Sequence, residues 1–286
     1  MKVNPKENRY FAIKLLVSIA VYLLLFYGVF TLATSDNPKS DSVLRIALTY
    51  IGIILVFLLF QTGLMIGYLK GNAIKITSKQ FPDIYNILVK ESEALGLSKI
   101  PDAYVWQQGG LLNAFTLKFI GTHYVVVYSD VLAEAYKKDQ STVAFIIGHE
   151  LGHIKRKHYL KKLLLLPGSI IPFLGSAYSR ACEYTADAFG AYLSPEGAIA
   201  GMTLLAAGPH LAAKVDTQQF ILQAQTEDGF WPWFAEKTAS HPNLTKRVAE
   251  LERLYPEKPK AAVKSSYVME IEENPSEIDH SKYMPN

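Results

Sequence analysis

The chain has 286 residues and a formal net charge of +3, and half of its residues are hydrophobic. This hydrophobic content is high for a water-soluble enzyme, and it excludes a chain that is disordered throughout. The single cysteine excludes an intramolecular disulfide and fits a reducing compartment.

Two apolar segments near the N-terminus, residues 11–33 and 46–69, are each long enough to span a bilayer, which takes about twenty residues. A cleaved signal peptide is the alternative for the first segment, but its apolar run exceeds the usual limit of about fifteen residues. The short link of residues 34–42 permits a tight helical hairpin. We therefore predict that residues 1–72 form a transmembrane helical hairpin.

Positive charges lie before the first apolar segment of this hairpin and after the second. They are Lys2, Lys6, Arg9 and Lys14 before the first segment, and Lys70, Lys75 and Lys79 after the second. The link carries Lys39 together with two aspartates, although Arg45 at its margin reduces the contrast. Because lysine and arginine are enriched in cytoplasmic loops, we expect a multi-pass protein of the cell membrane whose catalytic domain faces the cytoplasm.

The next part of the chain alternates short strands with helices. Residues 81–95 have the pattern of an amphipathic helix, and residues 103–106, 111–119 and 123–128 have that of strands. The run Val125-Val126-Val127 is typical of a strand covered on both faces. A further helix is expected to begin at residues 130–136.

The pentapeptide His149-Glu150-Leu151-Gly152-His153 is the strongest functional signal. Residues four apart lie on one face of a helix, so the two histidines can direct their imidazoles at one metal ion. Glu150 follows His149 on the helix, where its carboxylate can reach a metal-bound water without binding the metal itself. This is the H-E-x-x-H arrangement of zinc peptidases, in which the glutamate is the general base. The alternative is a helix with two incidental histidines.

The flanks of this pentapeptide favour a helix. Asp139, Ser141 and Thr142 can cap its start, and a basic run from Lys155 suits its end. The extended metzincin motif would need a glycine and a third histidine at the positions of Arg156 and Tyr159, so that class is excluded.

A second helix supplies the remaining ligand. Glu183 and Asp187 are four residues apart, among small residues that suit close helix packing. Glu183 can be the third ligand, and Asp187 can accept the outer N–H of a ligating histidine and fix its orientation. Two solvated acids are the alternative. Cys182 would point about 100 degrees away from Glu183, so we interpret it as a small packing residue.

With these motifs in place, the sequence resembles the membrane zinc endopeptidases of the HtpX and CAAX prenyl protease type, within the gluzincins. The resemblance covers roughly residues 80–255 and rests on Asn113-Ala114-Phe115, His149-Glu150-x-x-His153, Glu183-x-x-x-Asp187, and His241-Pro242 followed by Arg247. It implies an α+β fold in which a zincin-like catalytic domain, with its active-site helix packed on a small mixed sheet, follows an N-terminal two-helix transmembrane anchor.

The resemblance also implies roles for two further residues. Asn113 would lie on the substrate-binding edge, and His241 would lie close to the metal. For His241 an equal alternative is a loop position before Pro242, ahead of a helix that starts near Asn243 or Thr245.

The interval between the two site helices departs from this family. HtpX-like proteins place two membrane spans there, whereas this chain has one apolar stretch, residues 163–178, interrupted by prolines and glycines. A single crossing would put Glu183 across the bilayer from His149. We therefore predict a membrane-proximal insert within the domain of residues 73–256, which is re-entrant, interfacial or a core hairpin. The basic run before it favours anionic headgroups over nucleic acid.

The C-terminal third contains three further features. Ser194-Pro195-Glu196 predicts the start of a helix with a capping serine, and Gly208-Pro209 predicts the end of that helix. Residues 245–254 have the pattern of a last amphipathic helix. The aromatic cluster at residues 230–234 either shapes a pocket, enters the membrane interface or closes the domain core, and we favour the core. Residues 257–286 have the composition of a disordered tail.

The ligand set predicts one Zn²⁺ per chain. Glu150 would take the proton of the attacking water and pass it to the leaving amine, with His241 or, less favourably, Tyr184 as donor to the oxyanion. An unfolded segment would pair with an edge strand along the segment of Asn113, which predicts broad specificity.

We predict a membrane-anchored zinc metalloendopeptidase that acts on unfolded or misfolded proteins, with the membrane quality-control role that HtpX-like enzymes imply. A prenyl-protein protease is less favoured because the multi-span chamber of that branch has no room here. An intramembrane protease is disfavoured by the charges around the pentapeptide. The rival is a non-proteolytic zinc-binding membrane scaffold or chaperone, against which the intact Glu150 argues. The sequence assigns no oligomeric state.

Overall fold

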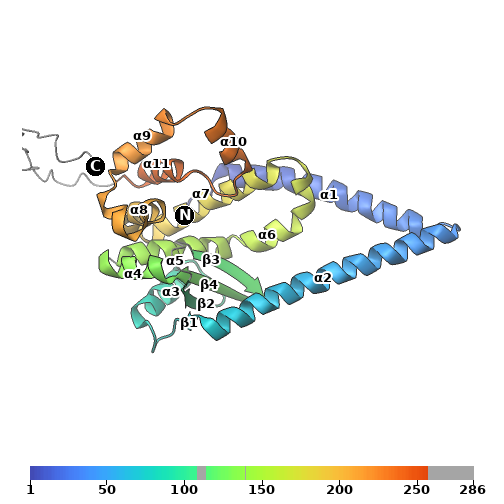
Figure 1. The fold of residues 1–286 in the computed structure, drawn as a ribbon, viewed down its shortest axis with the longest axis horizontal. Helices are drawn as coiled ribbons and strands as arrows, with labels where there is room; N and C mark the ends of the chain where they lie inside the picture. Colours follow the sequence, from blue (N-terminus) through green and yellow to red (C-terminus); the bar gives the residue numbers. More distant parts are fainter. Residues whose placement is uncertain (108–113, 139, 257–286) are drawn as a thin grey trace, which may run out of the picture. The chain divides into compact units, whose positions relative to one another are not determined.

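The chain begins with two long helices, α1 (Pro5–Ala33) and α2 (Pro38–Asn72), shown in Figure 1. The computed structural model describes residues 1–107, 114–138 and 140–256, without the side chains of residues 134–138 and 209. Both helices begin alike: the side chain of Asn4 or Asn37 accepts a hydrogen bond from a backbone N–H, and a proline follows. They start earlier than the predicted apolar segments because their first turns are polar.

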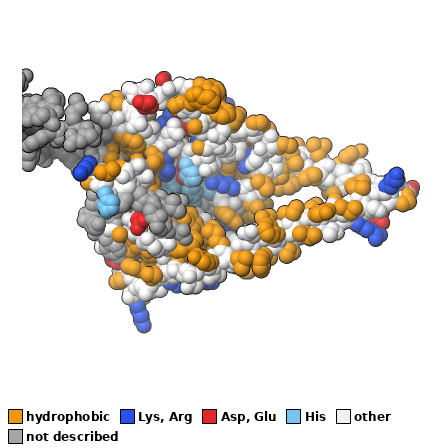
Figure 2. Space-filling view, in the orientation of Figure 1, with side chains coloured by type: hydrophobic (Ala, Val, Ile, Leu, Met, Phe, Trp, Pro, Cys, Tyr) orange, Lys and Arg blue, Asp and Glu red, His pale blue; other side chains and the backbone are white. Residues whose placement is uncertain are grey.

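The apolar side chains of α1 and α2 face outward over most of the length of both helices. Figure 2 shows them along the two helices, with charged side chains gathered where the helices meet. Both helices are long and apolar enough to cross a bilayer, as the predicted anchor requires. On α1, however, the polar side chains of Glu7, Lys14 and Ser18 are buried against the rest of the chain.

A mixed four-stranded sheet follows, in the order β1-β2-β4-β3. The strands are β1 (Ile74–Lys75), β2 (Asp102–Trp106), β3 (Ala114–Phe119) and β4 (Thr122–Tyr128). The predicted strands at 103–106 and 123–128 are confirmed, and that at 111–119 is confirmed from Ala114, since residues 111–113 lie outside the described residues. The two residues of β1 are too few to show a pattern in the sequence. β4 pairs parallel with β2 and antiparallel with β3, so its valines 125–127 are buried as expected. β3 is an edge strand.

The helix that carries the histidine pentapeptide, α5 (Gln140–Lys155), packs on this sheet and on α7 (Leu174–Leu193). Helices α3 (Pro82–Ala94), α4 (Ser129–Lys138) and α8 (Pro195–Leu211) also contact α5. The backbones of α5 and α7 come very close, because a Cβ at Gly190 would lie 2.6 Å from the carbonyl oxygen of Phe145. The predicted α+β fold is confirmed in this arrangement.

The start and end of α8 differ in detail from the prediction. Ser194 precedes the helix as expected, but its hydroxyl donates to the carbonyl oxygen of Ser141 and does not cap α8. The helix bends at Gly208, where φ is 75°, and continues to Leu211. A short 3₁₀ helix, η2 (Ala212–Lys214), follows it.

The apolar insert consists of the end of α6 (His158–Leu164), the 3₁₀ helix η1 (Leu166–Ile170) and the start of α7. It docks on α1, because the backbone N–H of Gly168 donates to Ser18 Oγ and the Tyr22 hydroxyl donates to the carbonyl oxygen of Leu164. The side chain of Ile170 is 73% exposed whereas those of Leu165 and Tyr178 are buried, so the insert is not packed wholly in the core. The re-entrant and interfacial alternatives stand.

The last helices are α9 (Thr217–Thr226), α10 (Phe230–Thr238) and α11 (Leu244–Leu254). The prediction that the aromatic cluster at residues 230–234 closes the core is wrong, because Trp231 is 75% exposed on α10. The ring of Phe234 contacts that of Phe173, with centroids 6.1 Å apart, so the cluster adjoins the insert. We refer to the exposed apolar side chains of the insert and of the cluster together as the apolar surface, namely Leu163, Leu164, Leu166, Ile170, Ile171, Phe173, Phe230, Trp231, Trp233 and Phe234.

Candidate metal centre

Three potential metal-binding side chains converge from the two packed helices. His149 and His153 come from successive turns of α5, and Glu183 comes from the middle of α7. The Nε2 atoms of the two histidines are 3.2 Å apart. The Glu183 carboxylate oxygens lie 3.5 Å from Nε2 of His149 and 3.6 Å from Nε2 of His153.

These separations fit a tetrahedral ion. Ligands bonded to zinc at 2.0–2.1 Å in a tetrahedral arrangement lie about 3.3 Å from one another. The trio therefore has the spacing and the chemical types of a three-ligand site with an open fourth position. Among the described residues, one other group of three potential ligands lies this close together, namely Glu7, His158 and Cys182.

The electrostatics differ between the members of the trio, since burial holds the pKa of His153 well below its usual value and keeps that ring neutral, as a metal ligand must be. Burial opposes charge on His149, but hydrogen bonds with Asp187 and Glu183 raise its pKa to about 10. Burial likewise opposes charge on Glu183, yet the two histidines and Arg247 hold the pKa of Glu183 well below its usual value. The buried Glu183 carboxylate therefore stabilises positive charge at this position.

Asp187 lies one helical turn after Glu183 and contacts the outer side of His149. Its Oδ1 is 2.9 Å from Nδ1 of His149, which leaves Nε2 of that ring facing the other two side chains. Arg247 on α11 donates to both oxygens of Asp187, at 2.8 and 2.6 Å. A buried ion pair therefore fixes the orientation of His149.

Glu150 lines the same cleft as the trio and is 4% exposed. Burial, countered in part by His149, raises its pKa to about 7. A carboxylate with this pKa is suited to accept and return a proton near neutral pH.

His241 reaches the cleft from the loop before α11. Its Nε2 lies 3.6 Å from Oε1 of Glu183, and its side chain is 64% exposed. Asn243 immediately precedes α11 and makes no capping hydrogen bond through its side chain. The structure therefore places His241 beside the trio, whereas Tyr184 is absent from the described lining of the cleft.

The comparison with known proteins agrees with this geometry. The sequence profile described as peptidase family M48 matches residues 78–174 and 164–255, which together cover more than half of the chain. The chain belongs to peptidase family M48. It is also similar to a CAAX prenyl protease 1 homolog from Dictyostelium discoideum, with 29% identity over 100 residues. That alignment covers 34% of this chain and 22% of the relative.

Membership of M48 places the chain in a family of metallopeptidases. Together with the two apolar helices, it identifies a membrane-associated metallopeptidase of the HtpX and CAAX protease type. Asn113 and Asp139 lie outside the described residues. The next residues of β3, from Ala114 to Thr116, line the M48 cleft, so its wall includes an edge strand.

Two side chains near the M48 cleft were missed in the sequence. Nδ1 of His158, at the start of α6, lies 2.9 Å from Nδ1 of His153. Arg247 had appeared in a motif but without a role, and the structure pairs it with Asp187. The signal for His158 was its position five residues after His153, which the surrounding lysines and arginine concealed within a basic run.

Proposed function

We propose that this M48 peptidase is a zinc-dependent endopeptidase that binds one Zn²⁺ through His149, His153 and Glu183. The observation that carries the proposal is the convergence of these three donors at 3.2–3.6 Å, with Asp187 behind His149. Zinc rather than a harder cation suits two imidazoles and one carboxylate.

When bound, zinc supplies a Lewis acid that acidifies water and polarises a substrate carbonyl. Glu150 accepts the proton of the attacking water and then delivers it to the nitrogen of the leaving amine. Burial of its side chain raises the pKa of Glu150, which favours its acting as a proton acceptor and then as a donor. His241, on the open side of the cleft, donates a hydrogen bond to the carbonyl oxygen as negative charge develops there.

The substrate is an extended segment of an unfolded or misfolded protein. β3 lines the cleft and is an edge strand, so it can pair with a substrate backbone by strand addition. Asn113, which directly precedes β3 in the sequence, is proposed to contact the same substrate. Recognition of backbone rather than side chains gives broad specificity, which suits quality control of membrane proteins.

The lipid bilayer is the second proposed partner. In this proposal α1 and α2 span it as a hairpin, and the charge bias of the flanking segments favours a catalytic domain in the cytoplasm. The apolar surface of the insert and α10 adjoins α1 through Ser18 and Tyr22. We therefore propose that this surface lies beside α1 at the membrane–water interface, where tryptophan side chains are favoured.

Cleavage of an unfolded protein by zinc-loaded protein in detergent, compared with Glu150→Gln, tests this proposal. Zinc content is measured in both preparations, and a chelator followed by added zinc tests reversibility. We expect cleavage by the wild type, its loss on chelation, and no cleavage by a mutant that still contains zinc. Two silent, zinc-loaded proteins would favour a non-proteolytic scaffold. Equal cleavage by both proteins would contradict the proposed role of Glu150.

A further inference from the structure

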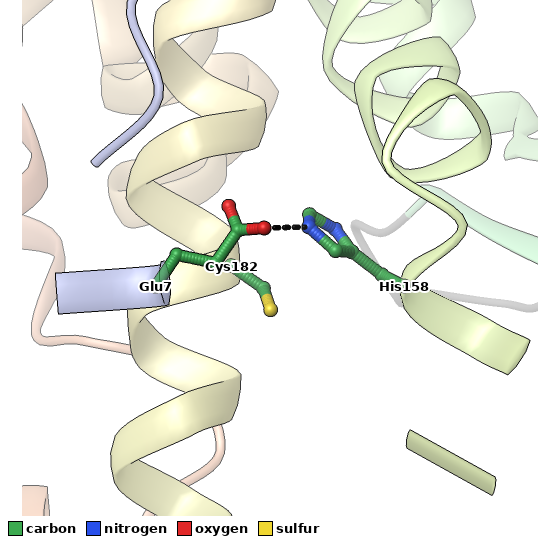
Figure 3. Close-up of side chains that lie close together, drawn as sticks. All are labelled: Glu7, His158 and Cys182. Atoms are coloured by element: carbon green, nitrogen blue, oxygen red, sulfur yellow. Dashed lines mark ion pairs between the residues drawn. The ribbon is translucent and has the colours of Figure 1, made fainter. Parts of the chain in front are cut away.

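A second group of buried polar side chains lies directly behind the metal centre. It consists of Glu7 on α1, His158 on α6 and Cys182 on α7, shown in Figure 3. Glu7 and His158 are each 1% exposed, and Cys182 is fully buried. Their potential donor atoms lie within 4.8 Å of one another, so they have the spacing of a metal site.

Two short contacts connect this group to the proposed zinc ligands: a hydrogen-bond contact between two histidine rings and an ion-pair contact with Glu7. Nδ1 of His158 lies 2.9 Å from Nδ1 of His153, and Nε2 of His158 lies 3.3 Å from Oε1 of Glu7. Figure 3 shows the His158 ring directed at the Glu7 carboxylate. A continuous line of side chains therefore runs from the membrane helix α1 to a zinc ligand.

The proton positions along this line follow from metal binding at His153. If Nε2 of His153 uses its lone pair on the metal, the neutral ring carries its hydrogen on Nδ1. That hydrogen can be donated only to an unprotonated Nδ1 of His158. The hydrogen of His158 is then on Nε2, where it faces the Glu7 carboxylate.

The same reasoning excludes a second metal in the Glu7, His158 and Cys182 group. With its hydrogen on Nε2, His158 has no lone pair to offer there. One oxygen of the Glu7 carboxylate is also already paired: Arg156 donates to Oε1 from Nε at 3.1 Å and from Nη2 at 2.8 Å, and Lys161 Nζ lies 3.9 Å from the same atom. A further cation would be repelled by these two charges.

We propose that Glu7 and His158 are positioning residues that hold His153 in its metal-binding orientation, so that the membrane helix α1 completes the metal centre. This inference rests on the zinc site proposed above. Glu7 acts on His158 in the way that Asp187 acts on His149, but through one intervening ring. The Glu7 carboxylate strengthens His158 as an acceptor, which in turn makes His153 a stronger ligand.

The zinc dissociation constant of full-length protein in lipid nanodiscs tests this inference, measured by competition with a chromophoric chelator. We expect Glu7→Gln and His158→Leu to weaken zinc binding about 10–100-fold, the usual effect of losing such a partner. His158→Asn keeps an acceptor oxygen near the position of Nδ1 and is expected to restore part of the affinity.

Ser18→Ala is the matched control for the docking of α1. Ser18 is also on α1 and 1% exposed, and its hydroxyl bonds to Gly168 rather than to the metal centre. We expect this variant to bind zinc as the wild type does. The visible spectrum of the cobalt(II)-substituted protein gives a second readout. It should change in Glu7→Gln, because the ligand field at His153 changes, and stay the same in Ser18→Ala.

The outcomes separate this inference from the proposed function. A wild type that binds no zinc overturns both. A wild type that binds zinc, with unchanged affinity and cobalt spectrum in Glu7→Gln, overturns only the role of Glu7 and His158. Equal losses in Glu7→Gln and Ser18→Ala would show a general effect of undocking α1 and would also overturn it. Two zinc ions per chain would identify a second metal site instead.

Discussion

The carboxylate of Asp187 lies between His149 and Arg247, with Oδ1 2.9 Å from Nδ1 of His149 and 2.6 Å from Nη2 of Arg247. Burial alone would raise the pKa of Asp187, but the neighbouring guanidinium holds it below its usual value. The carboxylate is therefore ionised and can both orient the imidazole and neutralise the buried arginine. One residue thus serves the metal centre and the stability of the fold.

Asp187→Asn is expected to weaken zinc binding about 10–100-fold, because His149 loses an anionic partner. It should also lower the free energy of unfolding by up to about 3–5 kcal/mol, because the buried Arg247 loses its main partner and keeps only the Glu183 carboxylate, 3.9 Å away. Chelator competition and chemical unfolding measure the two effects separately. Arg247→Gln is the control, since it breaks the ion pair but keeps the carboxylate on His149. Unchanged zinc affinity in Asp187→Asn would contradict the orienting role.

Gly190→Ala is expected to push α5 and α7 apart. The added Cβ would meet the carbonyl oxygen of Phe145 at 2.6 Å and the backbone nitrogen of His149 at 3.0 Å. We expect a loss of about 1–3 kcal/mol in the free energy of unfolding, together with weaker zinc binding. Thermal unfolding in detergent measures the first effect. Gly71→Ala on α2, where nothing lies within 4 Å of the added Cβ, should not destabilise the protein.

Glu91 on α3 is expected to make the protein less stable as the pH rises. Burial raises its pKa to about 8 from 4.5, so between these values the folded state binds more protons than the unfolded state. The free energy of unfolding therefore falls with increasing pH in this window, by up to about 1.4 kcal/mol per pH unit. Glu91→Gln should remove this part of the slope. Unfolding titrations from pH 5 to pH 8 test this, and identical slopes in both proteins would contradict it.

The apolar surface is expected to contact lipid through Trp231 and Trp233. Brominated lipids in nanodiscs should quench the fluorescence of these residues, after Trp106 is replaced by Phe to leave them as the remaining tryptophans. A variant that retains Trp106 alone reports on the sheet and provides the comparison. A water-soluble bromide serves as the control quencher. If brominated lipids quench the α10 tryptophans no more strongly than this control does, the surface lies away from the bilayer.

Much of the metal centre could be predicted because its information is local. The spacing of four residues within α5 and within α7 places His149 beside His153 and Glu183 beside Asp187 on their helix faces. The long apolar runs of α1 and α2 and the β-branched run of β4 are likewise local patterns. Each depends on the geometry of one helix or strand, which the sequence states directly.

The contacts that needed the tertiary structure join residues far apart in the chain. Nothing in the first turn of α1 shows that Glu7 will be buried against His158 and Arg156. The aromatic cluster of α10 is apolar and yet exposed, because the same composition suits a core and a membrane surface. The sequence by itself determined the fold class, the ligand types and their spacing. Packing decided that Asp187 stands behind His149 rather than His153, and that His158 and Glu7 stand behind His153, because burial and pairing depend on how whole helices dock.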